Sequence, residues 1–194
     1  MRTFEENPVQ WDETLWRYFR PERFEALVGE RALYFASANQ FTDPFEGAAA
    51  VIMNPPPPDP RYAEMEYPER AFRELKRLTK VSCWHRAEYE SDAMWQLYAG
   101  ERKGIAVCTT PARLRDAVGP FRLEPQYGAE TIWGGPVRYA DLTQIRLRAM
   151  SMERFFVKHR AFEWEREFRM AISLAHAEEN AVTIPPDGVT CRSI

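Results

Sequence analysis

Short apolar runs separated by turn-forming residues dominate the pattern of hydrophobic and polar positions along the chain. Short runs rich in aromatic and β-branched side chains indicate strands, whereas apolar residues that recur at helical spacing indicate helices. The first pattern predicts strands at residues 15–19, 31–36, 81–84, 104–109, 137–139 and 162–173. The second predicts helices at residues 21–29, 68–80, 91–99, 111–118 and 142–160. This mixture predicts an α+β fold with a central, mostly antiparallel sheet that is flanked by helices.

Proline and glycine residues set the boundaries of several of these elements. Pro21 at the first position of a helix and Gly29 at its end follow the usual asymmetry of helix termini. Residues 37–47 are rich in turn formers and are predicted to form a loop. Residues 54–60 include four consecutive prolines. Because proline cannot continue a helix or a central strand, this stretch is predicted to be an exposed, extended loop.

The length and composition of the chain favour one folded unit. The chain has 194 residues, of which 45% are hydrophobic and 13% aromatic, so it can bury a substantial core. Neither half carries enough strands for a sheet and core of its own. Residues 1–194 are therefore predicted to form a single domain that contains the loop at 54–60.

Charge and cysteine content restrict the class of partner and the compartment. The formal net charge of −3 provides no global positive field that would attract nucleic acid, so such binding would need a local patch. The 3 cysteines are scattered and do not form a disulfide pattern, which favours a reducing cytoplasm. No apolar stretch approaches the length of a membrane helix, and no membrane contact is predicted.

A charged segment near the C-terminus carries the most chemical information. If residues 162–173 form a strand, its period of two places Glu163, Glu165, Glu167 and Arg169 on one face. Adjacent carboxylates repel each other unless a cation, a proton or a ligand lies between them, which is typical of catalytic and sugar-binding sites. The alternatives are a ladder of surface charge, or a helix in which Glu163 pairs with Arg166.

Two further polar residues stand next to aromatic or buried-looking strands. His85 directly follows the predicted strand at 81–84, where a titratable side chain can contact a pocket; the alternative is a hydrogen-bonded structural histidine. Arg17 lies between Trp16 and Tyr18, so its stem can be buried while its guanidinium binds a carboxylate or a phosphate.

The loop at 37–47 adds two carboxylates, and several well-known motifs are missing. Asp43 is predicted to stabilise the proline turn through its own backbone, whereas Glu46 has no obvious local role. The chain lacks a P-loop, a dinucleotide-binding glycine pattern, a nucleophile elbow and paired cysteines. No spacing of ligand residues is diagnostic of a metal, and no metal site is predicted.

The order of these motifs is similar to that of the bacterial domain of unknown function 2971 family. The resemblance covers nearly the whole chain, but that family implies no activity. It rests on Leu33-Tyr-Phe, Phe41-Thr-Asp-Pro-Phe-Glu-Gly47, Ser82-Cys-Trp-His85 with Glu88, Glu90-Ser91 and Met94-Trp95, Gly104-Ile-Ala-Val, Val137-Arg-Tyr139, Lys158 and Glu165-Arg-Glu-Phe-Arg169.

The chain also resembles, at the level of fold, the ADP-ribosyltransferase superfamily. Members carry an Arg or His on an early strand, a Tyr or Ser on a second and a Glu on a later one. Arg17, then Tyr34 with Ser37, then the glutamates at 163–167 follow that order, although no strict Ser-Thr-Ser segment is present. The resemblance implies a split sheet and NAD as the cofactor, with the first two positions holding the nicotinamide ribose. The glutamate would orient a ribose hydroxyl against an oxocarbenium-like transition state.

These resemblances lead to the prediction of an NAD-dependent ADP-ribosyltransferase. Glu165 would be the catalytic carboxylate, Arg17 would hold a phosphate or ribose of NAD, and Tyr34 would stack on nicotinamide. The full predicted site has catalytic residues Glu165, Glu167 and His85, and cofactor-binding residues Arg17, Tyr34, Ser37 and Arg169. The target would be a protein or a nucleic acid, in a phage defence or toxin setting.

Two other functions remain open. The first is a metal-dependent nuclease that would use Asp43, Glu46, Glu165, Glu167 and Lys158. The second is a partner-binding module without catalytic activity, in which the charged segment is an interface and the proline-rich loop a docking segment.

Overall fold

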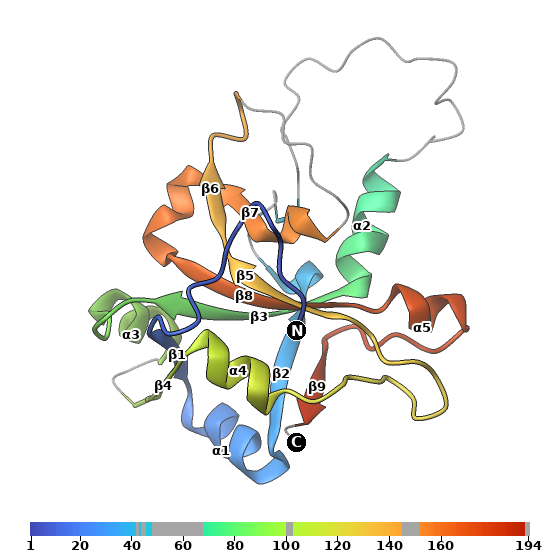
Figure 1. Ribbon diagram of the computed structural model, residues 1–194, viewed down its shortest axis with the longest axis horizontal. Coiled ribbons are helices and arrows are strands. Elements are labelled where there is room, and N and C mark those ends of the chain that lie inside the picture. Colours follow the sequence, from blue (N-terminus) through green and yellow to red (C-terminus); the bar gives the residue numbers. More distant parts are fainter. Residues whose placement is uncertain (42, 44–45, 48–67, 100–102, 145–151, 193–194) are drawn as a thin grey trace.

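The computed structural model describes residues 1–41, 43, 46–47, 68–99, 103–144 and 152–192. These residues form an α+β fold in which helices surround a strongly curled sheet (Figure 1). The fold class predicted from the sequence is therefore confirmed. The predicted proline-rich loop at 54–60 lies outside the described residues. None of the helices in the described part of the chain combines the length and the hydrophobicity that a membrane span requires.

Among the described residues, the main sheet has seven strands, and each pair of neighbours in it is antiparallel. Its strands are β1 (Leu15–Phe19), β2 (Ala32–Ser37), β3 (Thr79–Arg86), β4 (Ile105–Thr109), β5 (Ile132–Pro136), β8 (Glu167–Ser173) and β9 (Gly188–Arg192). A separate two-stranded sheet joins β6 (Arg138–Ala140) and β7 (Val157–His159) in parallel. The helices are α1 (Pro21–Glu30), α2 (Pro68–Leu78), α3 (Asp92–Tyr98), α4 (Pro111–Ala117) and α5 (Ala175–Glu179), with 3-10 turns η1 (Ala38–Gln40), η3 (Glu153–Phe156) and η4 (Arg160–Glu165).

The sheet divides at β3. One edge of β3 pairs with β8 along its length, and β8 continues to β5. The other edge is shared: Lys80 and Val81 pair with β2, whereas His85 and Arg86 pair with β1. β2 then continues to β9, and β1 to β4. The two arms therefore separate opposite the middle of β3, and α1 connects them.

Both faces of β8 are covered, which explains why its polar residues are buried. Phe168, Met170 and Ile172 belong to the larger apolar core. Because side chains alternate along a strand, Glu167 and Arg169 point to the opposite face. Ala171 on that face packs in a second apolar cluster with Phe155 and Phe156, so the polar residues of this face also lie inside the protein.

The helix predicted at 142–160 is wrong in the part of this range that is described. The chain from Met152 onward forms η3, then β7, then the start of η4. Phe155, Phe156, Val157 and Lys158 are all buried in succession. A surface helix buries only one stripe of its residues, so a strand-like segment that pairs with β6 accommodates this run better.

The strand predicted at 162–173 is correct only from Glu167 onward. Residues 160–165 form η4, where the His159 ring accepts a hydrogen bond from the Ala161 N–H at 3.2 Å. Arg166 then adopts a left-handed conformation with φ 43°, which turns the chain into β8. The period of two had predicted that Glu163 and Glu165 share a strand face with Glu167 and Arg169. This prediction is wrong, because Glu163 and Glu165 lie in η4 and not in β8.

Besides β7, three of the described strands and helices were not predicted, namely β5, α5 and β9. The sequence of β5, IWGGP, has little intrinsic strand propensity. A side chain at Gly134 would collide with the Met1 side chain, because the N-terminal segment packs against this strand. The Gly134 N–H donates to the Arg2 carbonyl at 2.8 Å, so tertiary contacts compensate for the weak local preference.

Candidate functional site

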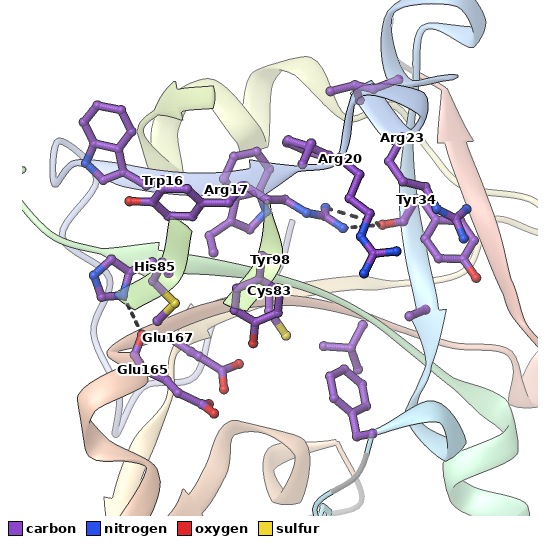
Figure 2. Close-up of a pocket in the computed structure, with 18 of the residues that line it drawn as sticks. Trp16, Arg17, Arg20, Arg23, Tyr34, Cys83, His85, Tyr98, Glu165 and Glu167 are labelled. Carbon is purple, nitrogen blue, oxygen red and sulfur yellow. Dashed lines mark hydrogen bonds between the residues drawn. The ribbon is translucent and has the colours of Figure 1, made fainter. Parts of the chain in front are cut away.

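A cleft of about 750 Å³ lies on the concave side of the curled sheet. Volumes of this size are typical of sites for small molecules and cofactors, roughly 300–1,000 Å³. Five of the residues predicted from the sequence contribute to its lining: Arg17, Tyr34, His85, Glu165 and Glu167. They come from β1, β2, β3, η4 and β8, so the fold brings together residues that are far apart in the sequence (Figure 2).

Two predicted residues, Ser37 and Arg169, do not line the cleft. Both are fully buried. Ser37 lies at the end of β2, and its Oγ has no hydrogen-bond partner among the described residues. Arg169 lies on the covered face of β8 beneath the cleft, where it contacts carboxylates. Neither side chain is therefore positioned to contact a cofactor in the cleft, as had been predicted for both.

Arg17 occupies the space where the two arms of the sheet separate. Its guanidinium donates to Ser82 Oγ at 2.6 Å and to the Tyr34 carbonyl at 3.4 Å. The rings of Phe19 and Trp84 lie 5.1 and 5.6 Å from its guanidinium carbon. Burial lowers the pKa of Arg17 to about 10, and no carboxylate among the described residues opposes this effect. Arg17 remains a cation at neutral pH, and its charge is not compensated.

Two more arginines line the same end of the cleft. Arg20 and Arg23 are exposed residues at the start of α1, and neither forms an ion pair with a described residue. Arg23 lies over the Tyr34 ring at 5.6 Å, and Arg20 points into the cleft (Figure 2). Neither arginine was predicted from the sequence to line a site. The signal was the spacing of three between Arg17, Arg20 and Arg23, which brings basic side chains to one end of β1 and its following helix.

Carboxylates and a lysine form the other end of the cleft. The Lys158 ammonium donates to Glu165 and, at 2.9 Å, to Glu167. Glu167 also accepts from Arg169 at 2.6 and 3.2 Å. Arg169 in turn holds Glu46 in a two-pronged contact. These buried groups include three carboxylates and two cations, so they carry one negative charge in excess.

The excess charge has its largest effect on Glu165. Burial, together with the hydrogen bond to and repulsion from Glu167, raises the pKa of Glu165 to about 7 despite the opposing effect of Lys158. Burial also acts on Glu167, but the charge of Arg169 and its other contacts hold the pKa of Glu167 well below its usual range. The pKa values of the two carboxylates therefore differ widely, which is typical of sites that transfer protons near neutral pH.

His85 supports the acidic end from β3. Its Nδ1 lies 2.7 Å from the Glu165 carbonyl oxygen, which can only accept, so Nδ1 carries the proton. The next residue, Arg86, donates its N–H to the Arg166 carbonyl at 2.8 Å. These bonds fix the turn between η4 and β8. His85 is therefore placed to hold Glu165 through the main chain as well as to line the cleft.

The same contacts bear on the nuclease alternative. Lys158 and Arg169 take up the carboxylate oxygens that a divalent cation would need, and Glu46 is enclosed with Arg169 away from the cleft lining. Within the described ranges, no group of three or more His, Cys, Asp or Glu residues is arranged to bind a metal. Three carboxylates that this alternative would use, Glu46, Glu165 and Glu167, are therefore paired with cations instead of being free to bind a metal.

A scan against protein-family models and searches of the curated proteins and the solved structures found no match to this chain. The resemblances to the domain of unknown function 2971 family and to the ADP-ribosyltransferase superfamily therefore stay predictions.

Proposed function

We propose that the protein is an NAD-dependent ADP-ribosyltransferase that holds NAD along the cleft, with the phosphates at Arg17 and the nicotinamide ribose at Glu165. One observation carries the proposal, namely the opposite charge of the two ends of the cleft. Arg17 is an uncompensated cation, and Glu165 ends a buried group that has one negative charge too many. Uncompensated buried charge is costly, and a ligand that supplies the missing charges stabilises the folded protein.

NAD has the charge distribution that such a cleft requires. Its pyrophosphate is anionic, whereas its nicotinamide ring is a pyridinium cation. A guanidinium is well suited to phosphate because its planar group donates two parallel hydrogen bonds. Arg20 and Arg23 add positive charge around Arg17. The nicotinamide ring would lie near Glu165, where its positive charge balances the excess negative charge.

The acidic end also supports the chemistry of glycosyl transfer. The bond between the ribose anomeric carbon and the nicotinamide nitrogen breaks, and its electron pair leaves with nicotinamide, which becomes neutral. The sugar develops positive charge, which Glu167, held ionised by Arg169, stabilises electrostatically. The acceptor then attacks the anomeric carbon, and Glu165 takes the proton that the acceptor loses.

The position of Tyr34 changes one detail of the predicted binding mode. Figure 2 places Tyr34 beside Arg23 and away from Glu165 and Glu167. Its hydroxyl donates to the Asp187 carbonyl at 2.9 Å, which keeps the ring at the arginine end. We therefore place Tyr34 on the adenosine side of the ligand. Tyr98 and Phe162, which line the cleft with Glu165, would contact nicotinamide instead.

The acceptor is proposed to be a macromolecule, in a defence or toxin setting. Large apolar side chains are exposed on α3 and η4, including Leu97, Tyr98 and Trp164, and Trp164 is adjacent to Glu165. Exposed aromatic residues beside a site are typical of surfaces that contact another chain. The same residues would serve the alternative of a partner-binding module, which differs in predicting no reaction.

Thermal unfolding at pH 8 tests the ligand, with NAD and NADH compared. NADH keeps the phosphates but has a neutral dihydronicotinamide ring, so it matches NAD except for the charge that Glu165 would meet. A ligand at a concentration of about 100 times its Kd stabilises by about 2.7 kcal/mol, which raises Tm by roughly 5–10 °C for a domain of this size. We expect NAD to give the larger shift, and we expect Arg17→Ala and the exposed Arg20→Ala to reduce it. Arg113→Ala, outside the cleft, is the control.

Release of nicotinamide tests the reaction. We expect the wild-type protein and Glu163→Gln to release nicotinamide from NAD, because Glu163 is exposed and does not line the cleft. Glu165→Gln should lose this activity. Release by Glu165→Gln at the wild-type rate would overturn the assignment of Glu165. Binding of neither nucleotide, with no release, would leave the partner-binding module as the better explanation.

A further inference from the structure

A buried row of alternating charges leads from the protein interior to the cleft. Its order is Glu46, Arg169, Glu167, Lys158 and Glu165, and each neighbouring pair forms an ion pair. The exposed fraction of the side chain is 0% for Glu46 and Arg169 and rises to 12% for Glu165. The row connects the loop near Glu46 with β8, β7 and η4, and only its last members line the cleft.

Arg169 has its donors fully engaged at the inner end of this row. Nε and Nη2 donate to the two oxygens of Glu167 at 2.6 and 3.2 Å, and Nη1 and Nη2 donate to the two oxygens of Glu46. Nη1 also donates to the Phe155 carbonyl at 2.6 Å. A lysine carries all its donors on a single nitrogen and cannot hold both carboxylates by paired hydrogen bonds in this way. Glu167 is thereby fixed in position and in its ionised form.

The outer end of the row differs, because Lys158 is the one cationic partner of Glu165 in the part of the chain that the structure describes. The other titratable groups near Glu165 are Tyr98 from α3 and Cys83 from β3, together with the His85 ring on its carbonyl. The side chain of Tyr98 is half-exposed but also lines the cleft, where desolvation and the charge of Glu165 raise its pKa to about 12. Burial raises the pKa of Cys83 well above its usual value, so both groups stay neutral near pH 7. Neither can compensate the excess negative charge.

We propose that Arg169, oriented by its two-pronged contact with Glu46, is a positioning residue that keeps Glu167 ionised and fixed, so that Glu165 carries the proton that enters or leaves the cleft. The reaction in which this proton takes part rests on the proposed function, but the assignment of the proton to Glu165 does not. The direction of the pKa shifts agrees with the geometry, since Glu165 is raised and Glu167 lowered. Arg169 and Glu46 thus act on the reacting groups without contacting the substrate.

The test is a carboxyl carbon NMR titration of the glutamate side chains in the full-length protein without ligand. In the wild type we expect one glutamate to titrate near pH 7, and its signal should be absent in Glu165→Gln. Glu46→Gln keeps the shape of the buried contact but removes one negative charge, so the pKa of Glu165 should fall by about half to one unit. Glu163→Gln, an exposed change on the same turn, should leave it unmoved.

A second variant keeps the question answerable if Glu46→Gln does not fold, which thermal unfolding reports. Arg169→Lys retains the positive charge but cannot bind both carboxylates at once. We expect the pKa of Glu167 to rise in this variant, because its carboxylate loses part of the contact that holds it ionised, and Glu167→Gln identifies its signal. A pH profile of nicotinamide release should shift with the titration.

The proposal is overturned if Glu165 titrates at the value of an exposed glutamate, or if Glu167 carries the proton in the wild type. It is also overturned if the titration of Glu165 is the same in Glu46→Gln and Arg169→Lys as in Glu163→Gln. Because the titration needs no NAD, these results are independent of the proposed function. The expected titration without any nicotinamide release would support the positioning role and overturn the transferase.

Discussion

Glu165 makes the folded protein less stable at alkaline pH, and its replacement reveals by how much. Its pKa is about 7 in the folded state, against 4.5 for an ordinary glutamate. Between pH 5 and pH 8 the folded state therefore retains a proton that the unfolded chain has released, so the free energy of unfolding falls as pH rises. At 1.36 kcal/mol per pKa unit, the side chain costs about 2–3 kcal/mol across this window. Glu165→Gln cannot titrate and escapes this cost.

Urea denaturation of the wild type and Glu165→Gln at several pH values between 5 and 8 measures the effect. The variant should gain about 2–3 kcal/mol relative to the wild type from the lower to the higher pH. Other titrating groups cancel in this difference, because both proteins contain them. Glu163→Gln should show no such gain, since Glu163 is exposed. A difference between Glu165→Gln and wild type that is constant with pH would refute the reasoning.

Further substitutions test the supporting structure. Arg169→Met leaves Glu46 buried without the cation it pairs with and Glu167 with Lys158 alone, so urea denaturation should show a loss of about 3–5 kcal/mol; a loss below about 1 kcal/mol would contradict the buried ion pairs. Ser91→Ala removes the side chain that accepts the Met94 N–H at the start of α3 and should cost about 1 kcal/mol in the same assay, whereas an unchanged stability would argue against the cap. The effect of Arg20→Ala on NAD binding, measured by calorimetry, should shrink as salt increases, and a salt-independent effect would speak against a phosphate contact.

The elements that the sequence predicted well are those whose boundaries are set locally. Pro21 begins α1 as predicted, and the helix ends at Glu30, one residue beyond the predicted end at Gly29. The strands on either side, β1 and β2, are mostly apolar, with Arg17 as the charged residue of β1. The predictions for residues 153–166 were wrong because the conformation of this stretch depends on contacts with distant parts of the chain. Its buried residues meet β6 and the second apolar cluster, and neither contact leaves a periodic signature in the sequence.

The candidate site shows the same division between local and distant causes. Glu165, Glu167 and His85 were found because clustered polar residues stand beside apolar runs. They meet for a reason other than strand alternation, since the left-handed turn at Arg166 brings the end of η4 beside the start of β8. The pairing of Arg169 with Glu46 joins residues separated by 123 positions, and no local pattern could have indicated it.

Above about pH 7, where Glu165 is ionised, the cleft carries a positive and a negative charge that cannot neutralise each other. Arg17 is held to Ser82 between the arms of the sheet, and Glu165 is held through its main chain by His85 and through its carboxylate by Lys158. Both ends are held at different positions along β3, at Ser82 and at His85, so the folded chain keeps a positive and a negative site apart in one cleft. A fold selected for stability alone would pair such groups or leave them in water. Their retention favours a ligand that is anionic at one end and cationic at the other, and this requirement distinguishes NAD from a nucleic-acid backbone, which offers only negative charge.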